Sequence, residues 1–173
     1  EILPNLCSGQ LHVVIASRSL RRKLMTHLIA GLALDGPVRV LDGGNCFNGR
    51  GLARHLRRES RSFYLPLKRV QISRAFTCYQ MTDLLQATPP LPAPTMVLDL
   101  LTTFYDESVP ITERSRLLDE ALSRIQTLSQ QAMLVISAPL PTAGDELLPR
   151  LEASVDRVWR FEAESASVQP RLF

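Results

Sequence analysis

Six polar residues between an apolar run and a helix-like segment form the first group that could do chemistry. The chain reads LHVVIA up to Ala16, and a leucine-rich segment follows from Leu24. The six residues of this group are Ser17, Arg18, Ser19, Arg21, Arg22 and Lys23. Cations at the start of a helix oppose its dipole unless an anion lies among them, so this group is a candidate anion-binding turn. The alternative is a solvated basic turn, which needs no ligand.

A second basic group lies in the stretch Gly49–Ser60, whose leucines are spaced as the buried side of a helix. Its opposite side carries Arg50, Arg54, Arg57 and Arg58. Such a face either contacts the phosphates of a nucleic acid or is simply hydrated. Arg114 and Arg116 are two further candidate nucleic-acid contacts, although pairing with acidic residues one helical turn away explains them equally well.

Histidine and cysteine are few, and their spacing predicts no metal site. The three histidines are His12, His27 and His55. None of them has a ligand spacing to another, and the apolar neighbours of His27 predict a packed side chain. Cys7, Cys46 and Cys78 form no CxxC pair, which favours packed or half-exposed thiols over a disulfide framework. No metal ligand set and no catalytic nucleophile are therefore expected.

Four short apolar runs are typical of strands that are buried on both faces of a parallel sheet. They are Leu11–Ile15, Val38–Leu41, Met96–Leu101 and Met133–Ser137. Helical spacing of leucine predicts helices over Ser19–Leu34, Gly49–Ser60 and Thr112–Gln131. Strands that alternate with helices predict an α/β doubly wound fold, with a mostly parallel sheet flanked by helices.

The sequence also predicts one late strand and one extended connection. Arg157–Phe161 alternates in hydropathy, which predicts a late strand that pairs antiparallel at an edge of the sheet. Ala87–Thr95 contains four prolines, so it is expected to be an extended connection rather than a helix or a central strand.

The overall composition is that of a soluble globular protein. With 173 residues, the chain is expected to form a single domain over residues 1–173. The net charge of +3 permits an acidic or phosphate-bearing partner. No apolar run approaches the roughly 20 residues that a membrane span needs, so a cytoplasmic protein without membrane contact is expected.

Several stretches, taken in order, resemble the ATPase core of the RecA-like recombinases, especially the archaeal RadA and eukaryotic branch with its paralogues. The resemblance runs from about Leu3 to Phe161. The matching stretches are SGQ with LHVVIA, VLDGGNCF, ISRAFTCYQMTDLL, MVLDLLTTFYD, LVISAPL and SVDRVWRF. Their order and spacing agree with the family throughout, and this agreement carries more weight than any single match. The resemblance implies a RecA-like core of the P-loop NTPase type.

The resemblance also implies a degenerate nucleotide site. A phosphate loop needs glycines for close backbone approach, a lysine for the outer phosphates and a hydroxyl for magnesium. The residues at the loop positions are Ala16, Arg21, Arg22 and Lys23. Asp99 matches the magnesium-facing carboxylate of the Walker B strand, but Gly44 stands in place of the catalytic glutamate. The sensor turn reads Ser137-Ala138-Pro139 instead of a polar pair, so neither ATP, magnesium nor another cofactor is expected.

The implied function is that of a catalytically inactive recombinase paralogue, an accessory factor in homologous recombination or DNA repair. It would bind a recombinase or another protein partner, and DNA. In the family, single-stranded DNA lies along two loops that match Asp106–Arg116 and Pro139–Leu147, but the second loop here is acidic, which opposes a phosphate backbone. Two alternatives are an ATP-binding or DNA-dependent ATPase with an atypical phosphate loop, and a structural subunit of an unrelated assembly.

Overall fold

Six strands form one parallel sheet in the order β3-β2-β4-β5-β1-β6. The structure is a computed structural model that describes residues 9–161, so Cys7 and Ser8 lie outside the described residues. The strands are β1 (Leu11–Ala16), β2 (Val38–Asp42), β3 (Val70–Arg74), β4 (Thr95–Leu98), β5 (Leu134–Ala138) and β6 (Arg157–Phe161). The predicted α/β class with a sheet of parallel strands is therefore confirmed.

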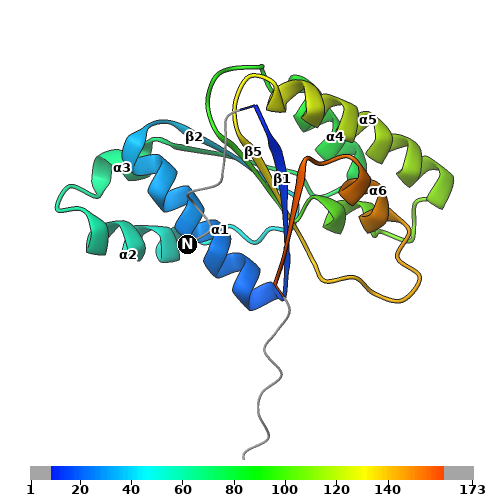
Figure 1. Ribbon diagram of the computed structural model, residues 1–173, viewed down its shortest axis with the longest axis horizontal. Coiled ribbons are helices and arrows are strands. Elements are labelled where there is room, and N and C mark those ends of the chain that lie inside the picture. Colours follow the sequence, from blue (N-terminus) through cyan, green and yellow to red (C-terminus); the bar gives the residue numbers. More distant parts are fainter. Residues whose placement is uncertain (1–8, 162–173) are drawn as a thin grey trace, which may run out of the picture.

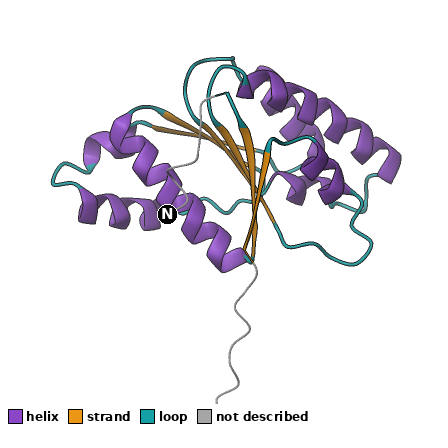
Figure 2. Ribbon diagram, viewed as in Figure 1, coloured by secondary structure: helices purple, strands orange, loops and turns teal. Residues whose placement is uncertain are grey.

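Helices cover both faces of this sheet (Figures 1 and 2). On one face lie α1 (Arg18–Asp35), α2 (Gly49–Glu59) and α3 (Tyr64–Lys68), and on the other lie α4 (Cys78–Ala87), α5 (Ile111–Ser129) and α6 (Leu147–Ala153). The side chains of β1 alternate between the two cores, because successive residues of a strand point to opposite faces. Val13 and Ile15 pack under α4–α6, whereas Val14 packs under α1 and α2.

The strand order differs from that of the dinucleotide-binding fold. In that fold the first two strands of the chain are neighbours, whereas here β4 and β5 lie between β1 and β2. The carboxyl ends of β1, β2, β4 and β5 all lie at one edge of the sheet, because all strands are parallel. Ligands of open α/β sheets bind outside this edge, so the residues that follow these four strands decide what the fold can bind.

The last strand was predicted with the wrong direction. β6 pairs parallel with β1, with His12 opposite Arg157 and Ala16 opposite Phe161. The helix α6 lies between β5 and β6 in the chain, and such a crossover returns the chain to the same end of the sheet, which makes parallel pairing possible. Hydropathy alternation in a five-residue strand contains no information about the direction of its partner.

One strand boundary and one further strand also differ from the sequence-based expectation. The strand expected over Met96–Leu101 ends at Leu98, and a 3-10 turn, η2 (Leu100–Phe104), follows Asp99. β3 was not predicted, because this edge strand exposes four of its five side chains and so lacks a buried apolar run. The proline-rich stretch does form the connection between α4 and β4, without a helix or strand over residues 88–94.

Between residues 9 and 161, no helix combines the length and the apolar character needed to cross a membrane.

Candidate functional site

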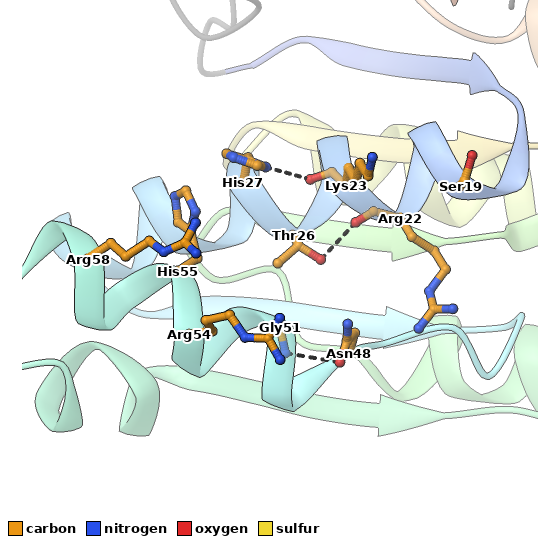
Figure 3. Close-up of a pocket in the computed structure, with 10 residues that line it drawn as sticks. All are labelled: Ser19, Arg22, Lys23, Thr26, His27, Asn48, Gly51, Arg54, His55 and Arg58. Atoms are coloured by element: carbon orange, nitrogen blue, oxygen red, sulfur yellow. Dashed lines mark hydrogen bonds between the residues drawn. The ribbon is translucent and has the colours of Figure 1, made fainter.

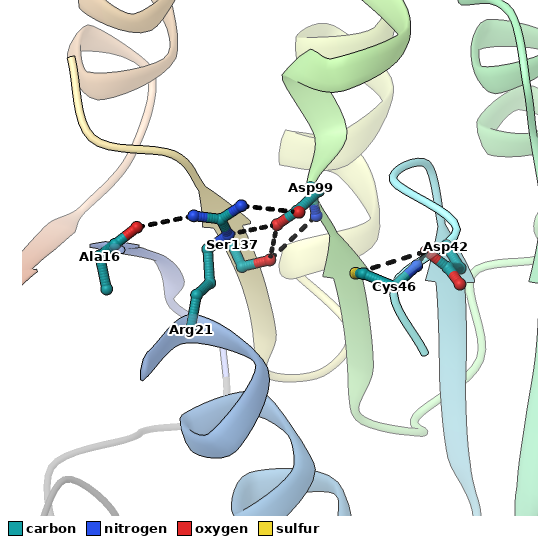
Figure 4. A network of polar contacts seen from close by, with 6 residues as sticks. All are labelled: Ala16, Arg21, Asp42, Cys46, Asp99 and Ser137. Carbon is teal, nitrogen blue, oxygen red and sulfur yellow. Dashed lines mark hydrogen bonds and ion pairs between the residues drawn. The ribbon is translucent and has the colours of Figure 1, made fainter. Parts of the chain in front are cut away.

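A buried ion pair fills the edge of the sheet where a nucleotide site would open (Figure 4). The guanidinium of Arg21 donates from Nε to Oδ1 of Asp99 at 2.5 Å and from Nη2 to Oδ2 at 2.8 Å. A third bond runs from Nη1 to the carbonyl oxygen of Ala16 at 2.6 Å. Both side chains are only 8% exposed. Arg21 thus connects the ends of β1 and β4 across the strand between them.

Asp99 is further held by the strand that lies between β4 and β1. The hydroxyl of Ser137, in β5, donates to Asp99 Oδ1 at 2.8 Å, and the backbone N–H of Asp99 donates to the same hydroxyl oxygen at 2.9 Å. Asp99 adopts a left-handed conformation with φ 50° and ψ 50°, which aspartate tolerates better than most residues. The carboxylate that the resemblance assigns to magnesium is therefore engaged by an arginine and a serine of the same chain.

Asp42 closes the turn after β2 instead of facing a ligand. Its carboxylate accepts hydrogen bonds from the backbone N–H groups of Cys46 and Phe47, each at 3.0 Å. This is the turn-forming role that aspartate often has at the end of a strand. Burial, followed by the charges of Asp99 and Asp42, raises the pKa of the Cys46 thiol to about 12. Cys46 is therefore protonated at neutral pH and is a poor nucleophile.

Gly44 lies so close to Asp99 that no side chain fits at this position. A Cβ added to Gly44 would lie 2.5 Å from Cβ of Asp99 and 3.0 Å from its Oδ2. The glutamate that activates water in the recombinase ATPases would stand at this position, according to the resemblance. The position of Asp99 against Arg21 thus leaves no room for a glutamate side chain at residue 44.

The cavity that remains beside the ion pair is about 10 Å³. Such a volume holds at most one water molecule, whereas small-molecule sites are typically about 300–1,000 Å³. Its lining includes Arg21, Asp99 and Ser137 together with Cys46 and Phe47 from the loop after β2. A nucleotide could enter this edge of the sheet only if the Arg21–Asp99 pair opened.

A larger hollow lies on the outer side of α1 and α2, and we call it the basic groove (Figure 3). It has a volume of about 500 Å³. Its lining residues are Ser19, Arg22, Lys23, Thr26, His27, Asn48, Gly51, Arg54, His55 and Arg58. Four of these ten residues are arginine or lysine and none is aspartate or glutamate, so the groove presents a positive surface to an anion.

Two sequence segments that were expected to act separately meet in the basic groove. Arg22 and Lys23 come from the stretch that the resemblance matches to a phosphate loop, whereas Arg54 and Arg58 come from the second basic group. This stretch forms no loop, because α1 begins at Arg18 and only Ser17 separates it from β1. Arg54 and Arg58 are four residues apart and therefore share one side of α2, whereas Arg22 and Lys23 are adjacent residues of α1 that both line the groove. The groove exists because α1 and α2 pack side by side on the same face of the sheet.

Two histidines lie together in this groove. The rings of His27 and His55 are 4.2 Å apart between centroids, at an interplanar angle of 66°. His27 is exposed, so the prediction of a packed histidine was wrong. The apolar residues that suggested packing, Leu28 and Ile29, lie on the other side of α1 and are buried.

The other predicted site residues lie away from the groove lining or are engaged elsewhere. Arg57 places its guanidinium 4.6 Å from the ring centroid of Phe63. Arg116 pairs with Glu113 and Glu120 along α5, on the opposite face of the sheet, and Arg114 on the same helix donates to the carbonyl of Phe104. Ser17, Arg18 and Arg50 do not line the groove.

Five groove residues were not predicted as site residues, namely Thr26, His27, Asn48, Gly51 and His55. A signal for most of them was present in the spacing. Polar residues recur every three or four positions from Ser19 to His27, and again from Asn48 to Arg58, which is the pattern of one polar helix side. What the spacing could not reveal is that these two sides face each other.

A second hollow, of about 700 Å³, lies between the two loops that the resemblance assigns to DNA. Its charged residues are Glu107, Arg114, Asp145 and Glu146. Asp145 accepts a hydrogen bond from Tyr105 Oη at 2.7 Å and caps the start of α6 through the N–H groups of Leu147 and Leu148. Three acidic residues against one arginine make this hollow a poor site for a phosphate backbone.

The described residues contain no group of three histidine, cysteine, aspartate or glutamate side chains that could hold a metal ion. The fold and the site thus define an α/β protein with a closed strand-end crevice and an open basic groove. Comparison of the chain with models of protein families and with curated protein sequences found no match.

Proposed function

We propose that this protein is a RecA-like core that does not hydrolyse nucleotides and that acts as an accessory factor in homologous recombination or DNA repair. It binds DNA through the basic groove and works with a recombinase or another protein partner. The ordered resemblance of its strand ends to the recombinase core supports the family assignment, and the parallel sheet is compatible with it.

The observation that carries this proposal is the different surroundings of the cations at the start of α1. Arg21 turns inward and is neutralised by Asp99, so it closes the crevice at the strand ends. Arg22 and Lys23 are exposed and line the basic groove with Arg54 and Arg58, and Arg22 also borders the small cavity beside the ion pair. The start of α1 thus closes the crevice at the strand ends and contributes cations to the groove on the outer side of the helices.

Duplex DNA suits the groove better than single-stranded DNA. Proteins that bind single strands stack the bases on aromatic side chains, and the groove lining contains no phenylalanine, tyrosine or tryptophan. Arginine and lysine contacts to phosphates carry little sequence information. We therefore expect binding to duplex DNA with little sequence preference.

Salt-dependent binding of a fluorescent DNA duplex by the full chain tests this proposal. If all four groove cations contact phosphates, the logarithm of the binding constant should fall with the logarithm of the salt concentration with a slope of about −3 to −4. A single strand of equal length should bind more weakly. Absence of binding at about 50 mM salt would contradict a DNA-binding role and leave a protein partner or a structural subunit as the function.

A melting experiment separates this proposal from an active ATPase. A ligand that binds only the folded protein raises its melting temperature by mass action. We expect Mg-ATP to raise it no more than ATP with EDTA, because Asp99 is engaged by Arg21 and has no room for a metal. ATP that binds in the basic groove would act equally with and without magnesium. A magnesium-dependent rise, together with phosphate release, would favour the atypical ATPase instead.

A further inference from the structure

The two histidines of the basic groove occupy a position that neither packing nor the arginines explain. His27 on α1 and His55 on α2 meet edge to face at one end of the groove, beside Arg58 (Figure 3). His12, the third histidine, is buried in β1 and does not belong to this cluster. Histidine is the side chain that changes its charge near neutral pH, so the charge of the groove depends on pH.

The hydrogen bond of His27 defines which of its ring nitrogens is available to bind a ligand. Nδ1 lies 2.8 Å from the carbonyl oxygen of Lys23. A carbonyl oxygen can only accept, so Nδ1 carries a proton and the neutral ring keeps a lone pair on Nε2. A lone pair repels an anion, whereas a protonated Nε2 donates to it. His27 can therefore bind a phosphate oxygen only after it takes up a proton.

Charged groups on three helices surround the pair. On α1 they are Arg22 and Lys23, and on α2 they are Arg54, Arg58 and Glu59. The short helix α3 packs against both and carries Lys68, whose ammonium group lies 4.5 Å from the ring centroid of Tyr64.

The pKa of His55 is lowered by burial first, and then by His27 and Arg58, whereas Glu59 acts in the opposite direction. An anion placed among these cations would favour the protonated rings, since a nearby opposite charge stabilises the charged form.

We propose that His27 and His55 contact the phosphates of the bound DNA directly, and that binding in the basic groove is coupled to proton uptake by this pair. The inference rests on the proposed DNA-binding function of the groove. The arginines and the lysine supply a constant positive charge, and the two histidines add charge only when an anion is present or the pH falls. DNA is therefore held more tightly in mildly acidic solution than in mildly basic solution.

The test is the affinity of the full chain for the same DNA duplex at about pH 6 and about pH 8, at constant ionic strength. Each proton taken up allows the affinity to rise by up to about tenfold per pH unit, and we expect a total rise of at least about tenfold toward pH 6. Arginine and lysine do not titrate in this range. The double variant His27→Gln/His55→Gln should bind with the same affinity at both pH values, within about twofold. The control Arg116→Gln, on the opposite face, should keep the full rise.

Calorimetry in two buffers of different ionisation enthalpy counts the protons directly. Uptake of protons by the wild-type complex, and none by the double variant, is the expected result. Equal affinity of the wild-type protein at both pH values, or a pH-dependent rise that persists in the double variant, would overturn the coupling while the DNA-binding function stands. If the wild-type protein bound no duplex at either pH, both the coupling and the proposed function would be wrong.

Discussion

Replacing Arg21 with methionine is expected to lower the free energy of unfolding by about 3–5 kcal/mol. The substitution keeps an unbranched side chain of similar length but leaves the Asp99 carboxylate buried without its cation. Ser137 still donates to Asp99, yet one hydroxyl does not replace a bidentate guanidinium. Equilibrium unfolding in urea, followed by circular dichroism, measures the loss.

Three further variants identify the origin of that loss of stability. Arg18→Met removes an exposed arginine from the first turn of the same helix and should change the free energy of unfolding by less than about 0.5 kcal/mol. Asp99→Asn should destabilise the protein because Arg21 then lacks its counter-charge, whereas the double variant Arg21→Met/Asp99→Asn should lose less than the sum of both. If the losses in free energy of unfolding of the two single variants simply added in the double variant, the ion pair would not close the crevice. The same would follow if the Arg21→Met protein were as stable as the Arg18→Met protein.

Reversing one charge on each wall of the basic groove is expected to weaken DNA binding by at least about 100-fold at low salt. The variant is Arg22→Glu/Arg54→Glu, with one substitution on α1 and one on α2. A hydrogen bond to a charged group contributes about 1.5–3 kcal/mol, so each lost phosphate contact alone costs about tenfold or more. The salt slope should become shallower by about two, because two fewer counterions are released per complex.

A control with the same change in net charge separates a local site from general attraction. Arg116→Glu/Arg150→Glu places the two substitutions on α5 and α6, beyond the opposite face of the sheet. Both arginines are exposed and form ion pairs with acidic neighbours, so the control should retain most of the affinity and of the salt slope. Similar weakening in both double variants would mean that DNA is attracted by net charge and that the groove is not a site.

The central strands and the long helices could be predicted because burial and helical spacing leave a local signature. Leu11–Ile15 and Val38–Leu41 lie within one residue of β1 and β2, and Thr112–Gln131 lies within two residues of α5. The two outermost strands of the sheet, β3 and β6, had no such signature. β3 exposes most of its side chains, and β6 could pair in either direction as far as its five residues indicate.

The candidate site was predictable only in part. Arg22, Lys23, Arg54 and Arg58 were candidates on the basis of charge alone, and the structure brings them into one groove. Arg21 belonged to the same predicted group, yet it is buried and neutralised. The difference between Arg21 and Arg22 is a rotation of about 100° around the helix axis, and only the packing of α1 on the sheet decides which of the two faces inward.

The amino-acid sequence by itself determined the class of the fold and the absence of phosphate-loop groups after the first strand. Both follow from residue types at given positions: apolar runs that must be buried, and a segment from Ala16 to Lys23 that has no glycine and no hydroxyl at its last position. Only the tertiary structure decided what fills the carboxyl ends of the strands. Arg21 and Asp99 are 78 residues apart, as the parallel order of β1, β5 and β4 brings them together. His27 and His55 become neighbours only because α1 and α2 pack against each other, and contacts between distant segments leave no local trace in the chain.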